Sequence, residues 1–181
     1  EHAWQVVTFD DDADLATQVV TASLPAGTGT VTIPIPAPVD TASTFVLASV
    51  TTPNSGGDVG DRMVRVRLVD GATVEVTRQV TTGSVDVSVQ VVELRDGTTV
   101  QHGLLDLAAG QDATNATIPP VTMSRSSAFS TVQLPAGHSG GSTTAAAGGT
   151  AGEAAVRVRL LDPATVEVRR DSTVAPASFA W

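Results

Sequence analysis

One stretch of the sequence occurs twice. VRVRLVDGATVEVTR at residues 64–78 returns as VRVRLLDPATVEVRR at residues 156–170, which is 92 positions later. Twelve of the seventeen residues at 64–80 are identical to their counterparts at 156–172, so the chain contains an internal duplication. In a chain of 181 residues this predicts two domains of roughly 90 residues each. We expect them at residues 1–88 and 89–181.

The repeated stretch has the pattern of a β-hairpin. Apolar residues alternate with charged ones on both sides of the turn sequence DGA at 70–72. A three-residue loop places Arg67 opposite Glu75 and Leu68 opposite Val74, which gives one apolar face and one face with an ion pair. The second copy predicts the same register in two pairs, Arg159 with Glu167 and Leu160 with Val166.

Short segments of strand pattern, separated by turn residues, fill the rest of both copies. They lie at residues 17–24, 30–34 and 43–50 in the first copy and at residues 100–107, 116–120 and 127–134 in the second. Val and Thr are abundant and aromatic residues make up only 3%, which favours strands with β-branched cores. The sequence therefore predicts an all-β protein with two tandem antiparallel β-sandwich domains.

Two details of this strand assignment are open to test. Residues 13–20 also fit a helical pattern, which is the only competing assignment. Phe45 and Phe129 fall at matching places in the two copies, and we expect both to anchor a core.

A segment that is continuous inside the chain is divided between its two ends. SVDVSVQVVEL at 84–94 closes the first copy and opens the second, whereas its halves occur as AWQVVTF at 3–9 and SFAW at 178–181. An unpaired strand edge invites completion by another chain. We therefore expect a head-to-tail subunit interface formed by Trp4, Val6, Phe179 and Trp181. A longer tandem array cut at an arbitrary point gives the same end pattern.

Residues suited to chemistry are few. Asp10, Asp12 and Asp14 belong to the densest carboxylate cluster and are candidate calcium ligands, the alternative being a solvated turn. The three histidines stand far apart, and no serine lies in a nucleophile elbow. We expect a protein that is not an enzyme and that needs no cofactor, with calcium as the one candidate ion.

The composition limits the kinds of partner that the protein can bind. The net charge of −9, with ten Arg and no Lys, argues against nucleic acid binding because phosphates require a clustered basic face. No apolar run is long enough to span a membrane. Asn115 begins a glycosylation sequon, Asn-Ala-Thr, which matters only in a secreted protein. Both tryptophans are terminal and suit either a sugar ring, a subunit contact or the edge of a core.

The hairpin, the WQVVTF-like strand and the aromatic-containing strand after a proline-ended one together resemble tandem repeats of bacterial surface or secreted β-sandwich proteins. They are also similar to the H-type lectin arrangement, in which Trp4 resembles the Trp of the closing strand. The resemblance implies an extracellular or cell-surface location. It leaves two functions open: a structural protein that polymerises with itself into a filament or surface assembly, or an adhesion module that binds glycans at an oligomer interface.

Overall fold

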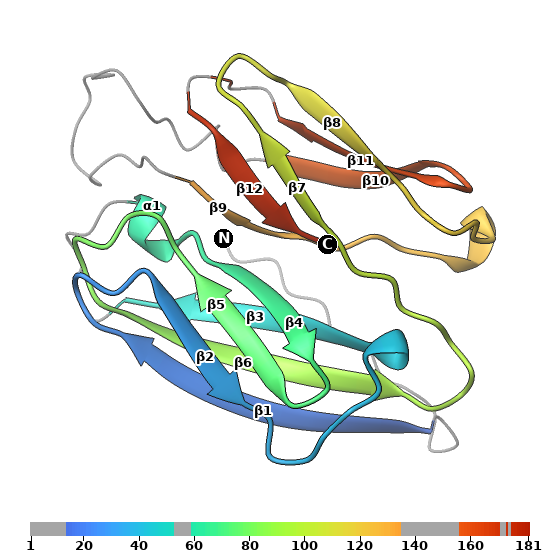
Figure 1. The fold of residues 1–181 in the computed structure, drawn as a ribbon, viewed down its shortest axis with the longest axis horizontal. Helices are drawn as coiled ribbons and strands as arrows, with labels where there is room; N and C mark the ends of the chain where they lie inside the picture. The colour runs from blue at the N-terminus through green and yellow to red at the C-terminus, as the bar shows by residue number, and fades with distance from the viewer. Residues whose placement is uncertain (1–13, 53–58, 135–155, 171–172, 174) are drawn as a thin grey trace, which may run out of the picture.

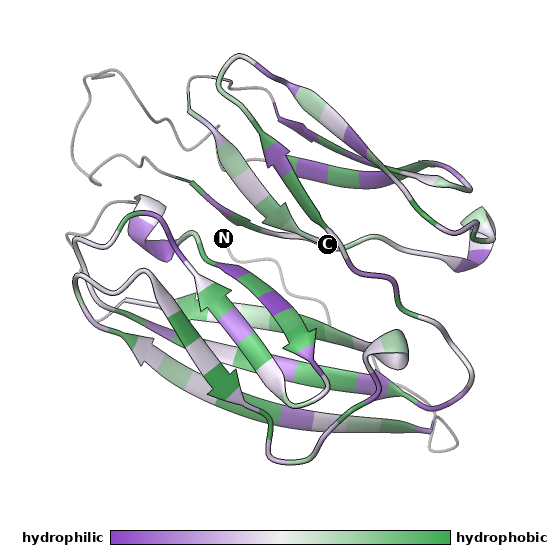
Figure 2. Cartoon of the chain, viewed as in Figure 1, coloured by the Kyte–Doolittle hydropathy of each residue, from purple (hydrophilic) through white to green (hydrophobic). Residues whose placement is uncertain are grey.

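The computed structural model describes residues 14–52, 59–134, 156–170, 173 and 175–181. In these parts of the chain, twelve strands form four antiparallel three-stranded sheets, which are arranged as two pairs (Figure 1). The protein is therefore all-β with two tandem sheet pairs, as predicted. Along strands such as β4 and β10, apolar and polar residues alternate, which is the pattern of strands with one buried face (Figure 2).

The first sheet pair contains the three longest strands among the described residues. They form one sheet with the order β1 (Leu15–Leu24), β6 (Val85–Leu94) and β3 (Thr44–Thr51), and the other sheet has β2 (Thr30–Pro34), β5 (Thr73–Thr77) and β4 (Arg65–Asp70). The competing helical assignment for residues 13–20 is wrong, since Leu15 begins β1. The core between the two sheets is built mainly of valine: Val20, Leu24, Ile33, Ile35, Val64, Val66, Val74, Val76, Val85, Val87, Val89 and Val91.

The second sheet pair repeats the same order, with shorter strands in one of its sheets. That sheet has β7 (Leu104–Leu107), β12 (Ala177–Ala180) and β9 (Thr131–Gln133). The other has β10 (Val156–Asp162), β11 (Thr165–Arg170) and β8 (Ala113–Thr117). Its core cluster is smaller and consists of Leu107, Val132, Leu134, Val168, Ala177 and Phe179.

Short helical elements complete the fold. The 3₁₀ turn η1 (Thr41–Ser43) precedes β3, and η2 (Met123–Arg125) takes the matching place before β9. One helical turn, α1 (Val59–Arg62), precedes β4. The duplication seen in the sequence is thus a duplication of topology as well, because each strand of the first pair has a counterpart in the second.

The predicted hairpin register is confirmed in both copies. Arg67 is paired with Glu75 and Arg159 with Glu167, and in each pair the Nε to Oε1 distance is 2.7 Å. The hydrogen bond from the arginine is the main reason that the pKa of each glutamate lies below its ordinary value. The predicted loop differs slightly, since the register shifts between Leu68 and Asp70 and thus leaves a two-residue turn.

Two counterpart assignments need correction. β8 spans Ala113–Thr117, three residues before the predicted segment at 116–120. Phe129 was expected to anchor the second core, but it is 60% exposed and stacks on Phe45 with ring centroids 6.1 Å apart. Because Val132 pairs with Phe179 as Val50 pairs with Val87, the counterpart of Phe129 is Leu47, which is also exposed.

The expected boundary between residues 88 and 89 falls inside β6. All ten residues of β6 pair with β1, and eight of them also pair with β3, so the whole strand belongs to the first sheet pair. The change to the second pair comes after Leu94. Sequence similarity could not show this, because the segment 84–94 resembles both the end and the beginning of a copy.

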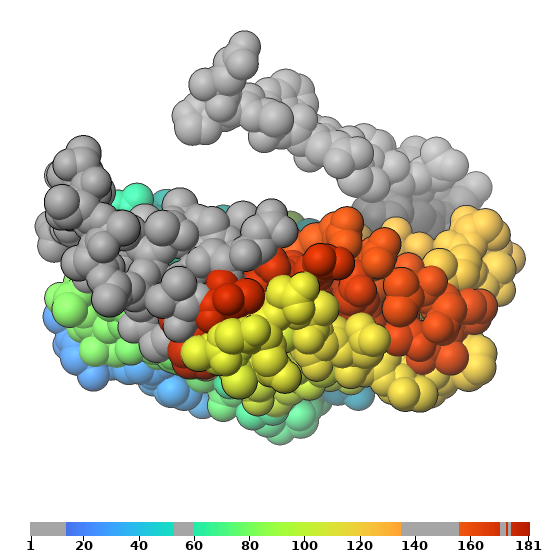
Figure 3. Space-filling model, turned by 90° about the horizontal axis from the view of Figure 1, so that it is seen from above, coloured from blue at the N-terminus to red at the C-terminus, as the bar shows by residue number. Residues whose placement is uncertain are grey.

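The two sheet pairs are joined through the edge strand β4. The Thr131 hydroxyl donates to the Val66 carbonyl at 3.0 Å and accepts the Val66 N–H at 2.9 Å, and Arg65 donates to the Ser178 hydroxyl. β4 also contacts β12. Viewed from above, the second pair (yellow to red) faces the reader and the first (blue to green) lies behind it (Figure 3). An edge strand of the first pair is therefore covered by the second.

Candidate functional site

The two copies differ most at one end of the sheet that contains β12. In the first pair the central strand β6 runs through residues 90–94, between the first half of β1 and the first half of β3. In the second pair the counterparts of those halves, residues 98–103 and 126–130, are not in strands. Within the described residues no strand lies between them. We call residues 98–103 and 126–130 the open sheet end.

Trp181 marks the beginning of the open sheet end. It continues β12 by one pair, since the Gly103 N–H donates to the Trp181 carbonyl at 2.9 Å and the Trp181 N–H donates to the Gly103 carbonyl at 3.1 Å. The indole lies on Gly103: a Cβ at that position would be 2.3 Å from Cζ2. Val89 and Val20 occupy the matching places in the first pair. Where the first copy pairs two valines, the second pairs the large Trp181 with a glycine.

Two buried polar atoms at the open sheet end have no hydrogen-bond partner among the described residues. They are Nε1 of Trp181 and Oε1 of Gln101. In the first pair the counterpart Gln18 makes two bonds with Ala37, whose N–H donates to Oε1 at 2.8 Å. In the second pair Nε2 of Gln101 donates to the Pro119 carbonyl, so Pro119 takes the place of Ala37; a proline has no N–H, and it therefore donates no bond to Oε1 of Gln101. Buried polar groups in proteins normally have partners.

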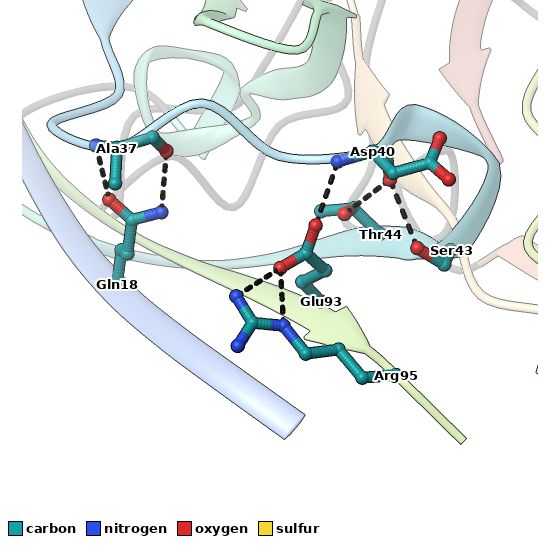
Figure 4. A network of polar contacts seen from close by, with 7 residues as sticks. All are labelled: Gln18, Ala37, Asp40, Ser43, Thr44, Glu93 and Arg95. Atoms are coloured by element: carbon teal, nitrogen blue, oxygen red, sulfur yellow. Dashed lines mark hydrogen bonds and ion pairs between the residues drawn. The ribbon is translucent and has the colours of Figure 1, made fainter. Parts of the chain in front are cut away.

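The same end of the first pair is closed by a polar network (Figure 4). Glu93 on β6 accepts the Asp40 N–H at 2.8 Å and pairs with Arg95 at 2.8 Å, and these contacts lower its pKa, with the Asp40 N–H as the largest cause. Thr44 donates its hydroxyl to the Asp40 carbonyl at 2.6 Å. The network binds the last residues of β6 to the loop before β3. The counterpart of β6 in the second pair, β12, ends before the position that Glu93 occupies.

The four residues predicted to form a subunit interface have different positions. Phe179 is fully buried in the core of the second pair and thus contributes to the stability of its own sheet. Trp181 is partly exposed at the open sheet end. Trp4 and Val6 lie outside the described residues.

Of the other predicted site residues, the structure describes Asp14 and Asn115. Asp14 is exposed, whereas Asp10 and Asp12 lie outside the described residues. In the part of the chain that is described, no group of three or more metal-binding side chains occurs. Asn115 is exposed on β8, opposite Glu167 on β11, where its side chain is accessible.

A second feature is a hollow of about 410 Å³ on the outer face of the sheet that contains β6. Cross-strand rows of short polar residues line it, because Thr21 pairs with Ser88 and Ser88 with Ser49. Asp86 lies two pairs further along, on the same face, and accepts a hydrogen bond from the Ser23 hydroxyl. Hydroxyl groups beside a carboxylate can donate to and accept from a polar ligand such as a sugar.

Two buried arginines were missed from the sequence. Arg78 donates to the carbonyls of Leu24, Pro25 and Thr28, and its Nη1 lies 3.8 Å from Oδ1 of the buried Asp61. Burial lowers the pKa of Arg78, and Asp61 partly offsets this. The one available signal in the sequence is the duplication, because Arg78 has an identical counterpart in Arg170 at the end of the second hairpin.

Arg170 is also buried and donates to three backbone carbonyls, those of Ala108, Gln111 and Ala175. In both copies the arginine thus ties the loop after the first strand to the end of the hairpin.

Comparison of the chain with protein family models, with curated proteins and with solved structures found no match in any of the three. Among the described residues no helix is long and apolar enough to cross a membrane.

Proposed function

We propose that this protein is a non-enzymatic structural module of an extracellular or cell-surface assembly, whose copies join head to tail by sharing a strand. The observation that carries this proposal is the open sheet end. In the first sheet pair, residues 90–94 of the central strand lie between β1 and β3. Within the described residues of the second pair, no strand occupies the matching place. An incomplete sheet of this kind accepts an added strand from another chain.

Further support comes from the chemistry of the open sheet end. Residues 98–103 and 126–130 are not in strands, and an added strand brings backbone N–H and carbonyl groups that can pair with theirs. The resemblance to bacterial surface repeats agrees with a role in which the module itself is the building unit. A head-to-tail contact is heterologous, and when the rotation between successive copies does not close a ring it yields a linear polymer.

The test is electron microscopy of the purified chain over a concentration series, with light scattering in parallel. We expect linear particles that lengthen with concentration. Removal of residues 1–9 should abolish them and leave the circular dichroism of the folded sheets intact. Removal of residues 178–181 is unsuitable, because Phe179 belongs to the core.

Val6→Asp is the corresponding point variant, and Val19→Asp is its control, since Val19 is already 60% exposed on β1. We expect the first to prevent polymerisation and the second to leave it unchanged. Folded monomers of the unaltered chain at every concentration would contradict the proposed function.

The hollow beside Asp86 favours a second candidate function, a carbohydrate-binding adhesion module. Its hydroxyl rows and carboxylate suit the hydroxyl groups of a neutral sugar. A glycan array tests it: saturable binding that is lost in Asp86→Ala but kept in Asp106→Ala, a change on β7, would support this function. Binding that survives Asp86→Ala would exclude the hollow.

A further inference from the structure

We infer that residues 5–9 of a second copy fill the open sheet end, in a register that places Gln5 between His102 and Phe129. This inference rests on the proposed function and adds to it the identity of the donated strand and its alignment. The sequence of the donor is QVVTF, and the strand that fills the matching place in the first pair is QVVEL at residues 90–94. Three of five residues are identical and the last is apolar in both.

The register follows from the pairing in the first sheet pair. Gln90 on β6 pairs with Val19 on β1 and with Leu47 on β3. The pairing of β12 shows which residues of the second pair correspond: Leu107 takes the place of Leu24, and Val132 that of Val50. Counting back along both strands, His102 is the counterpart of Val19 and Phe129 that of Leu47.

The alternation of faces agrees with this register. Val91 is fully buried between the sheets of the first pair. Val6 takes its place in the donated strand, beside Gln101 on one side and Ala128 on the other. Gln5 then faces outward with His102 and Phe129, which are both exposed. A shift by one residue would turn Val6 to solvent and Gln5 into the core.

The hydrogen-bonding pattern fixes the spacing of the first new pair. Gly103 and Trp181 exchange both of their backbone hydrogen bonds. In an antiparallel ladder such a pair is followed by one without hydrogen bonds, whose Cα atoms lie about 4.5 Å apart. The pair of His102 with Gln5 is therefore of the closer kind. This separation lies within the range of roughly 4.4–6.8 Å that a disulfide bond can bridge.

The experiment is disulfide trapping, which is clean here because the chain has no cysteine. Gln5→Cys and His102→Cys are combined in one chain, oxidised, and analysed on a non-reducing gel. The control combines Gln5→Cys with Gln101→Cys, one residue out of register and on the opposite face. We expect a ladder of covalent oligomers from the first variant, at least about tenfold more abundant than from the control.

Mixing the two single variants, Gln5→Cys and His102→Cys, tests whether the donor is a second copy. We expect a heterodimer in the mixture and peptide mass spectrometry that identifies the bond between positions 5 and 102. A ladder that is equal in the control would overturn the register. A cross-link found only within one chain would overturn the second copy as donor.

The two proposals fail in different ways. If the chain polymerises but Gln5→Cys and His102→Cys do not cross-link, head-to-tail assembly stands and the inferred register is wrong. If the unaltered chain does not polymerise and the Gln5→Cys and His102→Cys variant does not cross-link at any concentration, the proposed function fails, and this inference fails with it.

Discussion

The contact between Trp181 and Gly103 gives the sharpest test of how the second sheet ends. We consider the change Gly103→Val, the change Trp181→Val, and both together. The double variant recreates the pair that the first copy has at this position, Val20 opposite Val89. If the two side chains have adapted to each other, the double variant should be more stable than the sum of the single changes implies.

The magnitudes follow from the geometry. In Gly103→Val even the Cβ atom would lie 2.3 Å from Cζ2 and 2.6 Å from Nε1 of Trp181, so the indole must move. Such overpacking costs about 1–3 kcal/mol. Truncation of a fully buried tryptophan lowers the free energy of unfolding by about 3–5 kcal/mol. Because Trp181 is partly exposed, we expect a loss of about 1–3 kcal/mol for Trp181→Val. Coupling between residues in contact is about 0.5–3 kcal/mol, and here it should favour the double variant.

The assay is thermal unfolding followed by far-ultraviolet circular dichroism on all four proteins. For a chain of this size each kcal/mol corresponds to about 2–4 °C in Tm. The decisive quantity is the coupling free energy, which is the change in unfolding free energy of the double variant minus the sum of the changes in the two single variants. Additive losses, with the double variant the least stable of the four, would show that the indole does not rest on Gly103 and would refute the reasoning.

Three further predictions concern the stability of the sheets. Arg78→Ala should cost about 3–5 kcal/mol in urea unfolding because it leaves a buried carboxylate unpaired, whereas Arg67→Ala, whose pair is partly exposed, should cost at most about 1 kcal/mol. Leu24→Ala should cost about 2–5 kcal/mol and Leu68→Ala clearly less, since Leu24 is fully buried and Leu68 only partly; a larger loss for Leu68→Ala would contradict this order of burial. The pKa of Glu75 is lower in the folded protein than in the unfolded chain, where it is near 4.5. The ionised Glu75 therefore stabilises the fold fully above that pH, and this contribution is lost as the pH falls through its lowered pKa. We expect Glu75→Gln to make Tm fall less steeply in acid, and an unchanged slope would contradict this.

The sequence was most informative where short-range pattern determines structure. The hairpin register could be predicted because alternation with period two and one turn leave a single alignment of Arg67 with Glu75. The all-β class was predicted from the same period-two alternation, which also recurs in both copies. The position of β8 was predicted wrongly: it begins three residues earlier, although the loop before it has the same length in both copies. The prediction matched Ile118 with Ile33, whereas the backbone hydrogen bonds show that Ile118 corresponds to Ile35.

The interior could not be predicted in the same way. Arg78 looks like the last residue of a polar strand face, yet it is buried because loop carbonyls converge on it from Leu24, Pro25 and Thr28. Its environment depends on three-dimensional contacts that no local pattern encodes. The prediction that Phe129 anchors the core was wrong for another reason. We assigned this large apolar residue to the core because of its type and its match with Phe45, whereas the register of its strand places it on the outer face.

Under the proposed function, the difference between the copies determines which one accepts the added strand. Both copies keep the buried arginine and the hairpin ion pair, which lie within each sheet pair. They differ at one end of one sheet, where Gln18 makes two bonds with Ala37, whereas Oε1 of Gln101 has no partner among the described residues. Pro119 stands in the place of Ala37 and has no N–H to donate. Within the proposal, exposed residues such as His102 contact the donated strand without supporting the core, whereas Gly103 and Trp181 contribute both to the joint and to the stability of their sheet.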